Sequence, residues 1–467
     1  MCLCALIIFQ EIKQENCYNK SLGRRFRFDI NNIYYVQQMI KSTGEEMHSW
    51  AKFLWPISRS ITGQGVRDTL AYLKKLLPDL TIKEVSSGAQ VFDWVVPNEW
   101  NIREAYVSDD QGNRIIDFQI NNLHIMGYSE PVDKWMELEE LDKHLYSLPE
   151  QPDAIPYVTS YYKRQWGFCL THHQRQSLNS KRYHVVIDSD LSPGVLNYAE
   201  LLIPGNCDKE VFLSTYVCHP SMANNELSGP VVTTALAQWI KSKESRRYTY
   251  RIVFIPETIG SIVYLSKNLE NLKKKVIAGY NITCIGDEMC YSFLPSRDGN
   301  TLSDKAALHA LKYIDSNFKQ YTWLDRGSDE RQYCAPGVDL PISSIMRSKY
   351  GEYPEYHTSL DDLSLVTPNG LEGGFNAIKN AIEIIENNVN PTVNVFCEPQ
   401  LGKRKLYPLV SKRGIDEKTR TIMNFISYCD GNNSLLEIAD KIDKPLTEIK
   451  NIMDELIKHN LINLNSE

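Results

Sequence analysis

Residues 211–229, VFLSTYVCHPSMANNELSG, decide the fold that we expect, because an apolar segment there ends at a histidine before a helix begins. Residues 211–217 have the composition of a mostly buried strand, and apolar side chains recur at helical spacing over residues 231–240. His219 therefore lies at the carboxyl end of a strand, which is the edge where open α/β sheets bind ligands. Ser228 is placed to cap the helix that follows.

Three later apolar strands each carry an acidic or imidazole side chain just past their carboxyl ends. After YRIVFI, VIAGYNITCI and ISSIM, these side chains are Glu257, Asp287 and His357. Since the carboxyl ends of neighbouring parallel strands meet at one edge of a sheet, we expect these three residues to gather around His219. Imidazole and carboxylate are the usual ligands of zinc, and a catalytic zinc site leaves one position open for water. The sequence therefore predicts a metal site at this edge.

Five sequence blocks follow one another in a specific order, at residues 91–100 (VFDWVVPNEW), 218–230, 256–262 (PETIGSI), 327–333 (GSDERQY) and 356–362. This order resembles that of the zinc-dependent aminopeptidases with co-catalytic metals. It looks more closely like a bacterial family of aminopeptidase-like proteins, often linked to surface-polysaccharide gene clusters. The resemblance spans roughly residue 47 to the C-terminus. It implies an α/β fold, in which helices flank a mixed sheet, with a β-rich inserted domain and a C-terminal winged helix.

The resemblance also assigns roles to single residues. In the related di-zinc enzymes, the positions of His219 and Asp287 hold one metal, and the position of His357 helps to hold the other. The position of Glu257 belongs to the general base that takes a proton from the metal-bound water.

Three positions depart from that pattern and argue against a full two-zinc site. Asn225 stands at the position of the bridging Asp and Thr258 at that of a metal-binding Glu, although an amide and a hydroxyl are poorer ligands than a carboxylate. Ser221 replaces the Asp that usually follows the first His. Two repairs stay open: a single metal on the retained histidines and Asp287, or a rearranged site in which Glu226 or Glu288 supplies the missing carboxylate. One zinc ion is favoured over two.

The expected substrate contacts come from two later segments. Within residues 325–331 (DRGSDER), the resemblance implies that Ser328 and Asp329 shape the site. Glu330 or Arg331 is a candidate for reading a substrate terminus, and a guanidinium presents a fork that matches a carboxylate. Tyr356 is expected to form part of the cleft wall beside the last histidine. Among the aromatic residues of the insert, residues 166–168 are the favoured cleft lining.

The length of 467 residues predicts two or three domains. We expect an N-terminal extension over 1–46, an aminopeptidase-like α/β domain over 47–84 and 206–398, an inserted β-rich domain over 85–205 and a winged-helix domain over 401–467. In the insert, short alternating segments predict strands at 91–96, 114–118, 123–126 and 184–187. Residues 82–85 are expected to join the main sheet.

The C-terminal segment has three helical patterns, followed by a short strand. Helices are predicted at 415–428, 434–442 and 447–459, and a strand at 461–464, which is a winged-helix layout. Its third helix mixes charges of both signs: Lys450, Lys458 and His459 with Glu448, Asp454 and Glu455. Because a DNA reader usually shows a basic face there, we favour a protein–protein or dimerisation role. Homo-oligomer formation stays open.

Composition limits the remaining classes of function. The formal net charge of −7 argues against general binding to nucleic acids or anionic membranes. No apolar run approaches the ~20 residues that cross a bilayer, and residues 1–9 (MCLCALIIF) lack the basic start of a signal peptide. The 11 cysteines show no paired spacing, which favours reduced thiols in the cytoplasm.

The sequence thus favours a cytoplasmic, zinc-dependent hydrolase that cleaves an amide bond in a peptide or an acylamino small molecule. Zinc would polarise the carbonyl group and Glu257 would carry the proton. The alternative is a non-catalytic regulator, in which a degenerate metal site senses a ligand and the winged helix transmits the signal.

Overall fold

The computed structural model describes residues 42–406 and 416–464, and the described residues from Thr43 onward lie in one compact unit. The expectation for residues 1–9 lies outside the described residues. Among the described helices, none is both long enough and apolar enough to cross a membrane.

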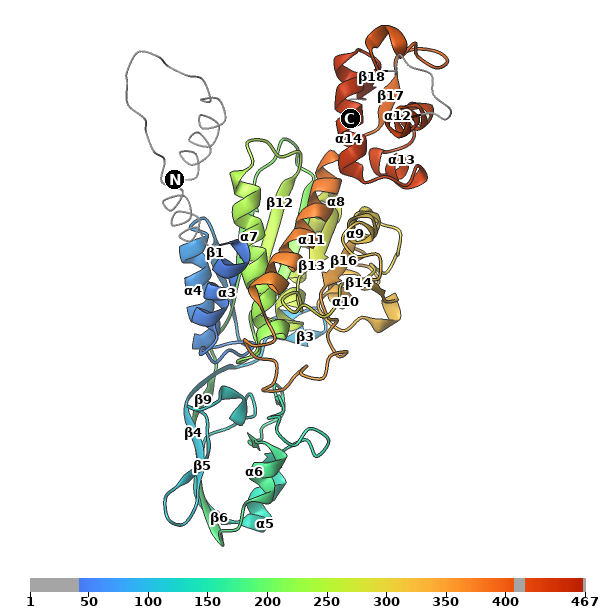
Figure 1. The fold of residues 1–467 in the computed structure, drawn as a ribbon. Helices are drawn as coiled ribbons and strands as arrows, with labels where there is room; N and C mark the ends of the chain where they lie inside the picture. Colours follow the sequence, from blue (N-terminus) through green and yellow to red (C-terminus); the bar gives the residue numbers. More distant parts are fainter. Residues whose placement is uncertain (1–41, 407–415, 465–467) are drawn as a thin grey trace, which may run out of the picture. The chain divides into compact units, whose positions relative to one another are not determined.

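An eight-stranded mixed sheet forms the centre of the fold (Figure 1). In spatial order its strands are β1 (Thr81–Ser86), β10 (Val195–Ile203), β12 (Thr249–Ile255), β11 (Glu210–Tyr216), β13 (Val276–Asn281), β16 (Ile342–Met346), β14 (Ser292–Leu294) and β15 (Lys319–Gln320). The strand β11 is parallel to both of its neighbours, and β13 is parallel to β16. The four predicted strands of the metal edge are therefore adjacent, and their carboxyl ends meet at one side of the sheet.

Helices cover both faces of this sheet. One face carries α3 (Thr43–Leu54), α4 (Gln64–Leu76), α7 (Ser228–Ser242), α9 (Leu302–Lys312) and α11 (Pro368–Asn387), and the other carries α8 (Ile259–Lys275) and α10 (Glu330–Tyr333). Along β11, Val211 and Leu213 join the first hydrophobic core and Phe212 joins the second. Burial on both faces explains why this strand is an unbroken apolar run.

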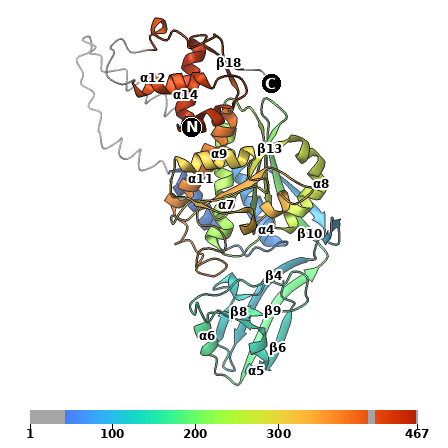
Figure 2. The same ribbon diagram turned by 90° about the vertical axis from the view of Figure 1, so that its right-hand side faces the viewer.

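The inserted segment contains a separate four-stranded antiparallel sheet (Figure 2). Its strands are β5 (Arg114–Asp117), β4 (Glu99–Ser108), β9 (Arg182–Ser192) and β6 (Val132–Glu137). Smaller elements complete it: β2 (Gln90–Val91), β3 (Trp94–Val95), α5 (Leu138–Leu141), η2 (Asp142–His144), β7 (Leu145–Tyr146), β8 (Phe168–Cys169) and α6 (His172–Gln176).

Three expectations for this segment change. Residues 91–96 do not form a single strand, because the chain turns between β2 and β3, which pair with each other in antiparallel fashion. Residues 123–126 do not form the predicted strand, because the chain makes a short 3-10 turn, η1 (Asn122–His124), in which the Asn121 side chain accepts the backbone N–H of Leu123. The strand β10 lies within the range expected for the insert, yet it pairs in the main sheet between β1 and β12. The prediction that residues 82–85 join the main sheet is confirmed.

The C-terminal segment has the predicted order of helices and strand. It contains α12 (Glu417–Ser427), α13 (Leu435–Lys441), α14 (Leu446–Lys458) and β18 (Ile462–Leu464), and β18 pairs in antiparallel fashion with β17 (Pro391–Val393). Apolar side chains of all three helices continue the hydrophobic core that α9 and α11 also enter.

Candidate active site

The turn after β11 fixes the first part of the site. Helical structure begins at Ala223, in a π-type turn, η3 (Ala223–Leu227), that runs on into α7. The Asp361 carboxylate accepts the backbone N–H groups of Asn224 at 2.6 Å and Asn225 at 2.9 Å. The predicted cap at Ser228 is therefore wrong, because the helical turn starts earlier and a distant carboxylate caps it. The Ser228 hydroxyl instead donates to the carbonyl oxygen of Asn224 at 2.5 Å.

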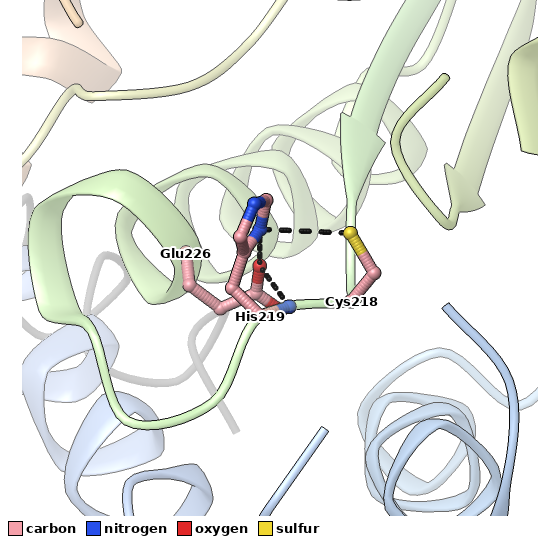
Figure 3. A group of neighbouring side chains, drawn as sticks. All are labelled: Cys218, His219 and Glu226. Carbon is pink, nitrogen blue, oxygen red and sulfur yellow. Dashed lines mark hydrogen bonds and ion pairs between the residues drawn. The ribbon is translucent and has the colours of Figure 1, made fainter. Parts of the chain in front are cut away.

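This turn brings Glu226 back onto His219 (Figure 3). One carboxylate oxygen of Glu226 lies 3.0 Å from the backbone nitrogen of His219 and 3.0 Å from its Nδ1. The other lies 3.2 Å from Nε of Arg59, and both charged side chains are fully buried. Arg59 also donates to the carbonyl oxygens of His219 at 2.9 Å and Leu54 at 2.8 Å. Since Glu226 occupies Nδ1, the second ring nitrogen of His219 is the one left for the site.

The electrostatics of this turn follow from burial and from the neighbouring charges. Burial by itself lowers the pKa of His219, but Cys218 and the Glu226 carboxylate raise it well above the ordinary value of an imidazole. Burial raises the pKa of the Cys218 thiol to about 11, so this thiol is neutral near pH 7. A neutral buried thiol is a poor nucleophile, and Cys218 does not have the environment of a catalytic cysteine.

A cavity of about 280 Å³ opens beside His219, and three other predicted residues line it: Glu257, Arg331 and His357. Nε2 of His219 lies 3.6 Å from a Glu257 carboxylate oxygen, and the hydroxyl of Ser328 donates to the other oxygen at 2.8 Å. The ring centroids of His219 and His357 are 5.7 Å apart. Two imidazoles and one carboxylate therefore share this cavity.

His357 is held in an unusual geometry. Its backbone has a φ of 56°, a conformation that costs energy for a residue with a side chain and is kept only when the surroundings impose it. Those surroundings include the Tyr356 ring, stacked at 3.9 Å, and the backbone N–H of Tyr157, which donates to the His357 carbonyl oxygen at 2.9 Å. Burial, reinforced by His219, lowers the pKa of His357 to about 3. Its Nε2 is buried and has no hydrogen-bond partner among the described residues.

Two predicted ligands lie in a different setting. Asp287 is fully buried and does not line the cavity, and both of its carboxylate oxygens accept hydrogen bonds. Its donors are the Asn224 amide at 2.8 Å, the Ser348 backbone at 2.9 Å and hydroxyl at 2.9 Å, and the Met289 backbone at 2.9 Å. Asn225 donates to the Tyr216 hydroxyl at 2.7 Å, while its own Oδ1 is buried with no partner in the described ranges.

The expected substrate contacts divide into two groups. Arg331 lines the cavity, and its guanidinium donates to the Thr258 hydroxyl at 2.7 Å. Asp329 is fully buried and accepts from the Thr258 backbone at 2.7 Å and from the Ser261 hydroxyl at 2.8 Å, so it fixes the start of α8. Burial, reinforced by Glu257, raises the pKa of Asp329 to about 8. Arg331 thus faces the cavity, whereas Asp329 supports the loop behind it.

The aromatic lining of the cavity differs from the one that the sequence favoured, and one buried residue of the site was not predicted. Residues 166–168 are not among those that line the cavity, and Trp166 instead stacks on His144 at a centroid distance of 3.6 Å. The aromatic lining comes from other parts of the insert: Trp94, Tyr157, Tyr161 and Tyr162. Arg59 was missed as well, since a lone arginine 160 residues before His219 gives no local signal.

Two sets of side chains offer donor atoms for a metal. Ligand atoms of Cys218, His219 and Glu226 all lie within 4.8 Å of one another. However, the Glu226 carboxylate of this set is already paired with Arg59 and with Nδ1 of His219, so it is not free to bind a cation. The cavity offers a better set, because Nε2 of His357 is buried without a partner in the described part of the chain. Two imidazoles on one tetrahedral zinc at ~2.1 Å have ring centroids roughly 5–6 Å apart, which the observed 5.7 Å matches. The residues at the cavity therefore fit a zinc ion.

Two family models and a relative match most of this chain. Residues 48–388 match the model of a domain of unknown function, DUF4910, and residues 389–464 match a winged helix-turn-helix model. A Clostridium acetobutylicum protein is 43% identical over 433 residues, which cover 92% of this chain and 98% of the relative. Its provisional name is polysaccharide biosynthesis protein with aminopeptidase-like domain.

Solved structures share the fold. The crystal structure of a protein from C. acetobutylicum, provisionally named a peptidase, has a TM-score of 0.86 at 41% identity and covers 94% of this chain and 100% of that one. The zinc aminopeptidase BSAP from Bacillus subtilis has a TM-score of 0.54 at 12% identity, over 73% of this chain and 94% of that one. At this identity the likeness concerns the fold alone. The expected aminopeptidase-like α/β fold and C-terminal winged helix are confirmed.

Proposed function

This chain belongs to the family defined by the domain of unknown function DUF4910, and we propose that it is a metal-dependent hydrolase of an amide bond. One observation carries the proposal: His219, His357 and Glu257 share one cavity at the carboxyl edge of a sheet with an aminopeptidase-like fold. Ligands bind at this edge in open α/β sheets.

In this proposal a single zinc ion is held through the Nε2 atoms of His219 and His357. Support comes from the unpartnered nitrogen of His357 and from the pairing of Nδ1 of His219 with Glu226, which presents its Nε2 to the site. When bound, zinc supplies a Lewis acid that polarises a carbonyl group and makes water more acidic. Asp287, Asn225 and Glu226 then support the site from outside the cavity.

Glu257 serves as the general base and later as the acid. The Ser328 hydroxyl fixes one of its carboxylate oxygens, and the other faces His219 within the cavity. That second oxygen is placed to take a proton from the attacking water and to return it to the leaving amine. Ser328 is therefore a positioning residue, as are Glu226 and Arg59, which hold the imidazole of His219 in one orientation.

Elemental analysis of protein purified without chelator tests this proposal. We expect about one zinc ion per chain, lost in His219→Ala and in His357→Ala. His173 is an exposed histidine of α6, so His173→Ala is a matched control that should keep the metal. Metal content that does not differ between the site variants and this control would refute the site.

We also propose that the winged helix serves protein contacts rather than DNA. In DNA-bound helix-turn-helix proteins, the N-terminal residues of the recognition helix meet base edges. Here the backbone N–H of Leu446, the first residue of α14, donates to Nε2 of the buried His309 on α9 at 3.0 Å. In α13, Asp440 pairs with His309 at 2.6 Å and Glu437 pairs with Lys305 at 3.5 Å.

Fluorescence anisotropy with labelled duplex DNA tests that role on the full chain. We expect no binding beyond the weak, strongly salt-dependent kind that phosphate contacts alone provide. A tight complex that persists at physiological salt would contradict the proposal.

A role in polysaccharide biosynthesis follows only from the name of the C. acetobutylicum relative, and the cytoplasmic location stays a prediction.

A further inference from the structure

The cavity is small, and only two of its lining residues, apart from the histidines, carry charge. Its volume of about 280 Å³ is at the lower end of the range for small-molecule sites, which suits a molecule of the size of a substituted amino acid. The charged residues are Glu257 and Arg331. A substrate is therefore chosen by what these two groups accept.

Glu257 is a poor anchor for a substrate ammonium group. One of its oxygens accepts the Ser328 hydroxyl and the other faces His219 at 3.6 Å. An ammonium group paired with Glu257 would occupy the carboxylate that the proposed reaction needs as its base. It would also lie in the field of Arg331, which is close enough to act on Glu257. A free N-terminus thus has no separate anion in this lining.

Arg331, by contrast, is available to an anion. Its guanidinium donates to the Thr258 hydroxyl at 2.7 Å, and Asp329 holds the backbone of Thr258 in turn. Within residues 42–406 and 416–464, no acidic side chain lies within ion-pair distance of Arg331. The anchored guanidinium therefore keeps donors for a carboxylate, which it can bind through two parallel hydrogen bonds.

The inserted segment supplies the apolar wall of the cavity. The hydroxyl groups of Tyr157 and Tyr161 lie 2.8 Å apart, and the rings of Trp94 and Tyr162 meet at a centroid distance of 6.2 Å. Such rings offer broad apolar surface with a few hydroxyl donors, which suits an uncharged acyl group or an apolar side chain.

From these observations we infer that the substrate is a small N-acylated amino acid with a free carboxylate, rather than a peptide with a free N-terminus. This inference rests on the proposed amide hydrolysis. Water adds to the acyl carbon, the C–N bond breaks, and the amine leaves with the proton that Glu257 carries, so that a carboxylic acid and an amino acid form. Arg331 holds the carboxylate that the amino acid part carries throughout.

Three compounds that share the phenylalanine side chain but differ in charge test the inference. They are N-acetyl-phenylalanine, which is anionic, N-acetyl-phenylalanine amide, which is neutral, and phenylalanine amide, which is cationic. Binding is measured by calorimetry on the zinc-free parent, which keeps both Glu257 and Arg331, and turnover on the zinc-treated parent. We expect the anionic compound to bind at least about tenfold tighter than the cationic one. Arg331→Gln should remove this preference and leave the affinity for the neutral compound unchanged. Arg326→Gln is the matched control, because Arg326 is exposed and contacts Trp323 instead.

The outcomes separate the two proposals. Anion-selective binding that depends on Arg331, without turnover of any compound, would support the inference and refute the hydrolase. Tighter binding of phenylalanine amide, no binding of the anionic compound at millimolar concentration, or an equal loss in the Arg326 control would overturn the inference. Hydrolysis of phenylalanine amide in preference to N-acetyl-phenylalanine would support the hydrolase and overturn the inference.

Discussion

Replacing Glu257 with Gln separates a base from a metal ligand. The substitution keeps the shape of the side chain and an oxygen that can accept the Ser328 hydroxyl, which lies 2.8 Å away. It removes the carboxylate oxygen that faces His219 at 3.6 Å. Removal of a general base costs about 10²–10⁴-fold in rate, which corresponds to roughly 3–5 kcal/mol in activation free energy. Since the hydrogen bond to Ser328 is kept, we expect the free energy of unfolding to change by less than about 1 kcal/mol.

The assay combines three measurements on one preparation: zinc content, thermal unfolding and hydrolysis of N-acetyl-phenylalanine. We expect Glu257→Gln to keep its zinc and its stability while turnover falls by at least about 100-fold. Glu288→Gln is the matched control, because Glu288 is exposed and pairs with Thr367. Turnover within tenfold of the parent would refute the role of base, and loss of zinc together with activity would show that Glu257 is a metal ligand instead.

Three further predictions concern stability. Arg59→Met should lower the free energy of unfolding by about 3–5 kcal/mol, because it leaves the buried Glu226 carboxylate without its partner, and adding Glu226→Gln should recover part of this loss in urea unfolding. Burial alone would raise the pKa of Glu99, but the Arg67 guanidinium lowers this pKa from 4.5 to about 2. The pair therefore stabilises the fold above pH ~4.5, and this stabilisation is lost as the pH falls toward 2. Glu99→Gln should therefore cost about 1–2 kcal/mol at pH 7 and flatten the pH dependence of the urea midpoint between those values, whereas an unchanged profile would contradict the assignment. His309→Ala should cost about 1–3 kcal/mol and speed proteolysis of the winged helix, because the buried N–H at the start of α14 loses its acceptor, and equal cleavage rates would count against this contact.

Glu226 lies between Arg59 and His219, and this position decides whether it can bind a metal. The sequence analysis allowed Glu226 as a replacement ligand, and the structure brings its carboxylate to Nδ1 of His219. Its other oxygen, however, meets a fully buried guanidinium. A buried carboxylate with that partner gains little from a metal ion, so Glu226 is better suited to orient the imidazole.

The sequence by itself determined most of the strands and helices and the order of the site residues. Apolar period and length are local properties, so β16 and the three helices of the winged helix could be predicted to within a few residues. The edge position of His219, Glu257 and His357 followed from strand ends in a parallel sheet. Local pattern was weakest at residues 123–126, where a side-chain cap stabilised a turn in place of the strand.

Only the tertiary structure decided which side chains meet. The Asp361 carboxylate caps a helical turn more than 130 residues earlier in the chain. Arg59 pairs with the carboxylate of Glu226, which lies more than 160 residues later. Tyr157 of the insert reaches the backbone of His357 across 200 residues. No local period encodes such pairs. They form because each buried charge or N–H group must find a partner once packing has removed it from water, and the folded chain alone fixes which partner lies within reach.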